Sequence, residues 1–330
     1  MRVLVTGGGG FLGLALCRAL VARGDEVRSL ARGDYPALAA LDVDARRGDV
    51  AEAAAVMKAA EGCDAVCHVA AKAGVWGPLA EYHRANVVGT QNVIAACRQH
   101  RIAKLVYTSS PSVAYAGGDE CGIDESVPYP SRYLTHYPRT KAEAERLVLA
   151  ANDGSLATVS LRPHLIWGPG DNHLLPRLLA KAKAGKLRRV GGGANIVDTT
   201  YIDNAVQAHV AALDRLTPQA ACAGRAYFIA NDQPQPLWSL IDRMLACGDV
   251  PPVTRGVSAT TAYLAGGLLE VIYGALRISS EPPMTRFVAR QLATSHWYDL
   301  TAAKRDLGYA PAVTVEEGLV RLRAWLQSKV

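Results

Sequence analysis

A glycine-rich turn directly after the first strand restricts this chain to few folds. The stretch VTGGGGFLG carries Gly7, Gly10 and Gly13 at intervals of three residues, and a helical pattern opens at Phe11 and Leu12. Glycine in this pattern makes a tight turn, lets the backbone approach a phosphate, and lets the helix pack closely on its strand. The free N–H groups and the dipole of the helix N-terminus attract negative charge. The stretch therefore predicts that these five residues bind the pyrophosphate of a dinucleotide.

Short apolar runs alternate with helical patterns through the first half of the chain. The expected strands are 2–7, 26–31, one that ends near 46–50, 63–71, 104–110 and 157–163, and the expected helices include 11–23, 80–100 and one starting near Tyr137. Strands that alternate with helices favour a parallel sheet covered on both faces. We predict an α/β fold with a doubly wound, parallel-sheet Rossmann domain.

The sequence pattern changes near residue 168, where glycine- and proline-rich loops separate less regular helices. We therefore expect an NADP-binding Rossmann domain over 1–167 and a smaller, mostly helical substrate-binding lobe over 168–330. The stretch AYFIAND still has the pattern of a strand, so return segments to the main domain are expected near 196–232.

Composition excludes several classes of function. Half of the 330 residues are apolar, a fifth are charged and the net charge is +6, without a block of like charges that would suit a nucleic acid. The seven cysteines are scattered, which argues against a disulfide framework, and Cys63, Cys67 and His68 lack a second ligand pair for a metal. The chain starts in a strand rather than in a signal sequence, so we expect a cytoplasmic protein without metal or nucleic-acid partners.

The segment 257–278 is the most membrane-like part of the chain. Only residues 256–269, fourteen in number, separate Arg255 from Glu270, whereas a membrane span needs about 20 apolar residues. Three interpretations stay open: a lid over a greasy substrate, a peripheral contact with a membrane surface, and an ordinary core helix.

The tip of the second strand discriminates between the two nicotinamide cofactors. A carboxylate at this position binds the ribose 2′-hydroxyl of NAD, whereas an arginine suits the 2′-phosphate of NADP. Ala31 stands at the tip, with Arg32 after it and Arg28 nearby, which favours NADPH. Asp34 is close enough to serve a 2′-hydroxyl if the loop curls back. Asp49, after the third strand, is placed to meet the adenine edge.

The chain resembles the extended short-chain dehydrogenase/reductase superfamily over nearly its whole length. The matching pieces are TGGGGFLG, HVAA, ANVVGTQNV, VYTSSPSVAY, LRPHLIWGPGD, TTYIDNAVQAHVAA and DLGYAPAVTVEEGL. The resemblance places a Tyr-x-x-x-Lys motif on Tyr137 and Lys141 and a catalytic asparagine on Asn86. It also implies cofactor contacts at Val50, Ala70, Ala71 and Pro163. The catalytic serine falls on Ser110, with Ser109 and Ser112 as alternatives.

Physical chemistry explains why such a family needs a tyrosine and a lysine four residues apart. The two side chains share one helix face, so they can act together. Tyrosine has a reference pKa near 10, and lowering it to near 7 requires roughly 4 kcal/mol in favour of the phenolate. A neighbouring ammonium and a helix N-terminus can supply that free energy. We therefore expect Lys141 to lower the pKa of Tyr137 and to bind the nicotinamide ribose, while Tyr137 exchanges a proton with the substrate oxygen.

Within the superfamily, the chain is similar to the branch of 3β-hydroxysteroid dehydrogenases and related bacterial reductases. That branch implies NADPH-dependent reduction of a β-keto group on a long-chain lipid. The resemblance favours a 2-alkyl-3-ketoalkanoic acid of olefin biosynthesis, reduced to the 3-hydroxy acid. The alternatives are a 3β-hydroxysteroid or sterol dehydrogenase, a nucleotide-sugar epimerase or dehydratase, and a non-catalytic NADPH-binding sensor. Nucleotide-sugar enzymes usually carry an arginine where this chain has Val197, just before Asp198.

The resemblance also implies partners. The substrate is expected to be a lipidic small molecule, and contact with a membrane or with another enzyme of the pathway is left open. Family members often pair through the two helices that flank the central strands, here about 80–100 and 137–151. We therefore expect a homodimer.

Overall fold

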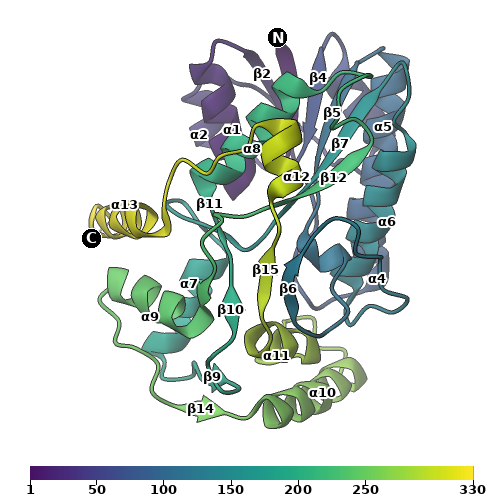
Figure 1. Cartoon of the computed structure of the whole chain (residues 1–330). Helices are drawn as coiled ribbons and strands as arrows, with labels where there is room; N and C mark the ends of the chain where they lie inside the picture. Colours follow the sequence, from purple (N-terminus) through teal and green to yellow (C-terminus); the bar gives the residue numbers. More distant parts are fainter. Residues whose placement is uncertain (330) are drawn as a thin grey trace.

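A seven-stranded parallel sheet forms the centre of the computed structural model, which describes residues 1–329 (Figure 1). Its strands are β1 (Arg2–Thr6), β2 (Glu26–Ala31), β3 (Asp44–Arg47), β4 (Ala65–His68), β5 (Lys104–Thr108), β7 (Ala157–Pro163) and β12 (Arg225–Ile229). Their order is β12-β7-β5-β4-β1-β2-β3, and every pair is parallel. The strand order reverses between β1 and β4, so a ligand crevice is expected at the carboxyl ends there. The predicted doubly wound fold is confirmed.

Helices cover both faces of this sheet. One side carries α1 (Phe11–Ala22), α2 (Pro36–Ala39) and α8 (Ile202–Arg215), and the other carries α3 (Ala53–Ala60), α5 (Gly89–Gln99) and α6 (His136–Ala150). Side chains alternate along β1: Val3 and Val5 pack in the α1 cluster, whereas Leu4 packs in the α3 cluster. This period of two explains why an unbroken apolar run marks a strand that is buried on both faces.

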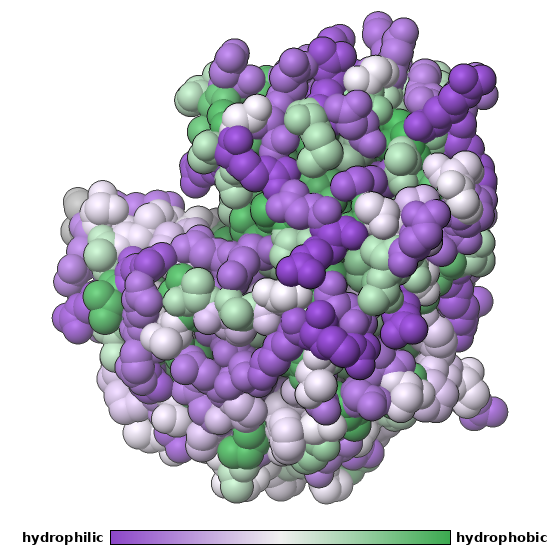
Figure 2. All heavy atoms as spheres, turned by 45° about the horizontal axis from the view of Figure 1, so that its top comes forward, coloured by the Kyte–Doolittle hydropathy of each residue, from purple (hydrophilic) through white to green (hydrophobic). Residues whose placement is uncertain are grey.

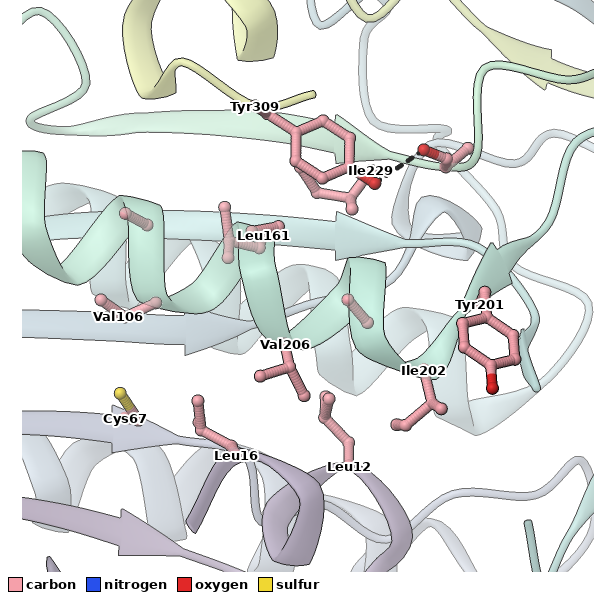
Figure 3. Close-up of a cluster of buried hydrophobic side chains, with 14 of the residues drawn as sticks. Leu12, Leu16, Cys67, Val106, Leu161, Tyr201, Ile202, Val206, Ile229 and Tyr309 are labelled. Carbon is pink, nitrogen blue, oxygen red and sulfur yellow. Dashed lines mark hydrogen bonds between the residues drawn. The ribbon is translucent and has the colours of Figure 1, made fainter. Parts of the chain in front are cut away.

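The C-terminal half of the chain completes the core of the main domain. Figure 3 shows Leu12 and Leu16 of α1 pointing toward Ile202 and Val206 of α8, across the face of the sheet. β12 extends the sheet beside β7. The hydroxyl of Tyr309 donates to the carbonyl of Ala230 at 2.8 Å and fastens the chain end that leads to the last helix. The N-terminal half of the chain is therefore stabilised by segments far away in the sequence.

A smaller lobe lies below the carboxyl ends of the main strands (Figure 1). Its helices are α7 (Leu174–Lys183), α9 (Leu237–Cys247), α10 (Ala259–Ala275) and α11 (Arg286–Ala293). A four-stranded sheet, ordered β13 (Gln235–Pro236), β10 (Ile196–Val197), β15 (His296–Tyr298) and β6 (Glu120–Ile123), joins the lobe to the main domain. These strands have two to four residues, too short for a readable alternation, so the sequence did not predict this second sheet.

The remaining elements are short pieces and the chain end. They comprise α4 (Leu79–Tyr82), a π-helix (His83–Val88), a 3₁₀ helix (Pro111–Val113), the two-residue pairs β8 (Ile166–Trp167) with β11 (Thr200–Tyr201) and β9 (Arg189–Val190) with β14 (Gly256–Val257), α12 (Thr301–Leu307) and α13 (Val315–Gln327). None of the helices in residues 1–329 has the length and apolar character to cross a membrane.

The surface differs between the two parts of the molecule. The view in Figure 2, with the main domain turned forward, is mainly hydrophilic and shows hydrophobic residues in small separate groups. In contrast, α10 exposes a series of large apolar side chains: Leu264, Leu268, Val271, Ile272 and, just after its end, Leu276. Their spacing of three and four residues places them on one face of the helix. Segment 257–278 is therefore not simply a buried core helix.

Candidate active site

The glycine turn has the close contacts that its sequence predicts. Gly7 has φ +74°, and a Cβ there would lie 2.9 Å from the Cα of Ala70. A Cβ on Gly13 would lie 2.2 Å from the carbonyl oxygen of Gly7, so the helix can approach the turn only without a side chain. Helix α1 begins at Phe11 after Gly10, with no side-chain cap and no acidic residue in its first turn. Its N-terminus therefore presents backbone N–H groups that suit a phosphate.

Arg28 does not lie where a cofactor phosphate would. Its Nε donates to Asp44 at 2.7 Å, and its Nη1 donates to the carbonyls of Ala59 and Glu61. Arg28 stands opposite Asp44 in the pairing of β2 with β3, within the strand rather than at its tip. The proximity of Arg28 to the phosphate site, suggested by the sequence, is therefore wrong.

A different arginine approaches the tip of β2. Ala31 is buried and Arg32 is exposed, and the Nε of Arg47 on β3 donates to the carbonyl of Arg32 at 3.2 Å. The guanidinium of Arg47 also lies 3.7 Å from the carboxylate of Asp34, and both side chains are largely exposed. Sequence reasoning missed Arg47 because its position beside Arg32 depends on strand pairing. The only local signal was the basic pair at the end of the third strand.

The two residues expected to contact the cofactor after β3 are fixed by neighbouring side chains. Asp49 accepts the backbone N–H of Ala51 at 3.0 Å and forms an ion pair with Arg84 at 3.0 Å. Val50 is buried, and its carbonyl accepts from Asn92 Nδ2 at 2.9 Å. These contacts hold the turn after β3 against the helix that carries Arg84.

The other expected cofactor residues lie at strand ends on either side of β5. The N–H of Ala70 donates to Thr6 Oγ1 at 3.2 Å, just after β4, and Ala71 next to it is exposed. Pro163 is the last residue of β7 and is buried. Parallel strands end at one edge of a sheet, so these positions and the glycine turn border the same crevice.

Ser110 is the serine that the structure brings to Tyr137. A hydrogen bond with Ser110 works to lower the pKa of Tyr137, although burial outweighs it and raises that pKa above its ordinary value. Ser110 also shares a hydrogen bond of 2.9 Å with Ser112. Ser109 is buried, with its N–H bonded to the carbonyl of Leu161. Ser112 thus contacts Ser110 and not Tyr137, and Ser109 is buried next to Ser110 in the chain.

Lys141 is buried and is bonded to a strand rather than to Tyr137. Its Nζ donates to the carbonyl of Thr108 at 2.5 Å and lies 4.1 Å from the ring centroid of Tyr107. Burial lowers the pKa of Lys141 to about 7, against an opposing effect of Glu145. Burial thus shifts the pKa of Tyr137 in the direction opposite to the expected one, and the ammonium that was expected to lower it is bonded to β5.

Asn86 is buried and bonds two segments that border the site. It lies in the π-helix, a widened turn that interrupts the single helix predicted over 80–100. Its Oδ1 accepts the N–H of Lys72 at 2.7 Å, and its Nδ2 donates to the carbonyl of Lys72 at 3.1 Å and to Thr140 at 3.0 Å. The amide of Asn86 therefore joins the segment after β4 to α6.

A tryptophan in the loop after β4 contacts the lobe. The indole N–H of Trp76 donates to the carbonyl of Ile278 at 3.0 Å, and its ring packs edge-on against Tyr273. The hydroxyl of Tyr82 in turn donates to the carbonyl of Trp76 at 2.9 Å. The loop after β4, which leads from the cofactor crevice, is therefore fastened to the end of α10.

Comparison with known proteins gives a consistent result. Residues 4–251 match the 3-beta hydroxysteroid dehydrogenase/isomerase family. A 2-alkyl-3-oxoalkanoate reductase of Stenotrophomonas maltophilia is 54% identical, over 98% of this chain and 99% of its own length. A protein of the same name from Shewanella oneidensis is 52% identical over 98% of this chain and 86% of its own length. The human sterol-4-alpha-carboxylate 3-dehydrogenase (decarboxylating) is 33% identical over 97% and 87%.

Solved structures share the whole architecture. The crystal structure of gox2253 superimposes with a TM-score of 0.80 at 25% identity and covers 99% of this chain and 98% of its own. The UDP-glucuronic acid 4-epimerase of Bacillus cereus, solved with UDP-glucuronic acid and NAD, gives a TM-score of 0.77 at 22% identity, with all of both chains covered. At this identity the second likeness supports the fold alone.

The burial of Lys141 predicts a pH-dependent stability. Between its native pKa of about 7 and its ordinary 10.5, the unfolded chain holds a proton that the native chain lacks. The free energy of unfolding should therefore rise with pH because of this group, by up to about 1.4 kcal/mol per pH unit.

Relative to the wild type, Lys141→Met should become progressively less stable from about pH 7.5 to about pH 9.5, measured by urea unfolding. Lys58→Met, at an exposed lysine on α3, is the control. Parallel stability curves for wild type and Lys141→Met would contradict the burial of the charge.

Proposed function

Because the chain belongs to the 3-beta hydroxysteroid dehydrogenase/isomerase family, we propose that it reduces a long-chain 2-alkyl-3-oxoalkanoic acid to the 2-alkyl-3-hydroxyalkanoic acid with NADPH. The family makes the chain an oxidoreductase that acts on keto or hydroxyl groups with a nicotinamide cofactor. The observation that carries the substrate is the pair of relatives at 54% and 52% identity, which share one name and match 98% of this chain.

The roles of the site residues follow from their environment. When bound, NADPH supplies the hydride to the keto carbon. Tyr137 donates the proton to the keto oxygen, and its raised pKa keeps the phenol protonated near neutral pH, as an acid in the reducing direction must be. Ser110 hydrogen-bonds the same oxygen, Lys141 binds the nicotinamide ribose, and Asn86 holds α6 in place.

Removing the phenol hydroxyl tests the reaction and excludes the sensor alternative. Tyr137→Phe should lower kcat by about 100-fold to 10,000-fold, because the proton donor is lost, while NADPH affinity stays near that of the wild type. NADPH oxidation with a long-chain 2-alkyl-3-keto acid measures kcat, and cofactor fluorescence measures binding. The matched control is Tyr133→Phe, four residues earlier, whose hydroxyl donates to the carbonyl of Val113. Turnover of sterols alone would contradict the proposed substrate, and unchanged kcat in Tyr137→Phe would contradict the mechanism.

The preference for NADPH is proposed from the charges at the tip of β2. A pocket there is lined by Ala31, Gly33, Tyr35 and Arg47, and Arg32 is exposed beside it. Two guanidinium groups near one phosphate position suit the 2′-phosphate. The carboxylate of Asp34 is the one opposing charge, and Arg47 lies close to it.

Arginine substitutions should separate the two cofactors. Arg32→Ala and Arg47→Ala should each raise the KM for NADPH by about tenfold to a hundredfold, because each removes a charge-assisted hydrogen bond, and should leave the KM for NADH unchanged. Arg18→Ala, which removes an exposed arginine farther along α1, is the control. A wild-type enzyme that uses NADH as well as NADPH would contradict the preference.

We further propose that the apolar face of α10 contacts a lipid surface or the lipidic substrate within it. Leu264, Leu268 and Val271 are each more than 60% exposed on this face. Arg277 follows the helix and is exposed, and the basic helix α7 lies near the connection to α11, where Lys181 donates to the carbonyl of Pro283. An apolar helix face with basic residues around it suits an anionic bilayer surface.

Two valines with equal exposure test this contact. Val271 on α10 is 69% exposed and Val320 on α13 is 70% exposed. Val271→Ser should weaken binding to phosphatidylglycerol vesicles by about fivefold to tenfold, because it removes one inserted side chain, whereas Val320→Ser should have no effect. Vesicle co-sedimentation measures both. Equal binding by the two variants would contradict the proposal, and a dimer lost only in Val271→Ser would assign the face to a second copy.

The homodimer stays a proposal. It rests on the expected pairing of helices near 80–100 and 137–151, which correspond to α5 and α6 with the short helices before α5. Molecular mass in solution tests it, and a monomer at micromolar concentration would contradict it.

A further inference from the structure

A buried ion pair lies one helical turn beyond Lys141. Glu145 on α6 and Arg162 on β7 are bonded through Arg162 Nη2 at 2.7 Å and through Nε at 3.1 and 3.2 Å. The side chains are 0% and 4% exposed. The spacing places Tyr137, Lys141 and Glu145 on one face of α6, at intervals of four residues.

Every other polar contact of Glu145 is also a donor. The hydroxyl of Tyr129 donates to Oε1 at 2.7 Å, and the hydroxyl of Ser160 donates to Oε2 at 2.7 Å. Burial alone would raise the pKa of Glu145, but the charge and hydrogen bonds of Arg162 reverse this effect and lower the pKa below its ordinary value. Glu145 is therefore an ionised carboxylate inside the protein.

Lys141 forms no direct ion pair among residues 1–329, and Glu145, one helical turn away, is the carboxylate whose charge acts on it. The Nζ of Lys141 contacts two groups of β5, the carbonyl of Thr108 and the ring of Tyr107, and neither is anionic. From β4 the nearby His68 is neutral, because burial lowers its pKa to about 3. On α6 itself, Tyr137 is a protonated phenol.

We propose that Glu145 is a positioning residue for the reaction: its carboxylate keeps the ammonium of Lys141 charged at the working pH, and Arg162 holds that carboxylate ionised and in place. This inference rests on the proposed function, since it assigns Glu145 a role in the same site. Burial lowers the pKa of Lys141 to about 7, and the charge of Glu145 opposes that shift. The protonated and neutral forms of the lysine are therefore both populated near pH 7. A small change in nearby charge then changes how much of the lysine is protonated.

Paired substitutions separate this role from a purely structural one. Glu145→Gln removes the charge, and its single amide oxygen keeps an acceptor for only one of the two hydroxyls, Tyr129 or Ser160. It also leaves Arg162 buried without a partner, which endangers folding. The double variant Glu145→Gln/Arg162→Met restores a neutral pair, and Glu145→Asp keeps the charge. Circular dichroism identifies the variants that fold.

The measurement is the alkaline limb of kcat against pH. In both variants that lose the carboxylate the limb should move to lower pH by about one unit, because Lys141 loses its proton earlier, while Glu145→Asp should keep the wild-type limb. A wild-type limb in a folded variant without the carboxylate overturns the proposal. Folding of Glu145→Asp alone also overturns it, because the pair then serves folding.

The NADPH dissociation constant against pH gives a second reading that needs no keto acid. Lys141 is the proposed ribose ligand, so cofactor affinity should weaken at lower pH in the charge-removed variants than in the wild type. A wild-type enzyme that binds NADPH with this pH dependence but does not reduce the keto acid refutes the proposed substrate and leaves the role of Glu145 standing. Identical pH profiles in wild type and variants refute the role of Glu145.

Discussion

The hydrogen bond from Lys141 Nζ to the carbonyl of Thr108 determines the geometry of this site. It fastens α6 to β5, a strand of the main sheet that ends two residues before Ser110. Because Lys141 lies one turn from Tyr137, the same bond brings the phenol to Ser110. A buried ammonium that loses its water needs partners, and a strand carbonyl and a tyrosine ring supply them.

Burying a charge is unfavourable, and three buried charges of this chain lie close together, two on α6 and one on the neighbouring β7. Lys141, Glu145 and Arg162 form a short series of alternating sign beneath Tyr137. The Glu145–Arg162 pair has two further donors on its carboxylate, so few of its acceptor positions are left without a partner. Lys141 lacks such a direct pair, and burial lowers its pKa to about 7 against the opposing charge of Glu145.

The two parts of the molecule divide the work. The parallel sheet and its glycine turn belong to a fold that is shared with a relative named for another substrate, the sterol dehydrogenase. The lobe carries the apolar face of α10 and reaches the crevice through Trp76 and Ile278. Differences in substrate within such a family are expected to arise in the lobe, because the reacting atoms are positioned by the sheet.

The amino-acid sequence determined the local features of this protein. β2 spans the predicted residues 26–31, β7 the predicted 157–163, and α1 begins at the predicted Phe11, because apolar period and glycine spacing are local properties. Only the tertiary structure decided contacts between distant segments. Strand pairing turned Arg28 toward Asp44 and brought Arg47 to Arg32. Folding also buried Glu145 against Arg162 and raised the pKa of Tyr137, since burial and distant charge are set by what packs around a residue and not by its neighbours in sequence.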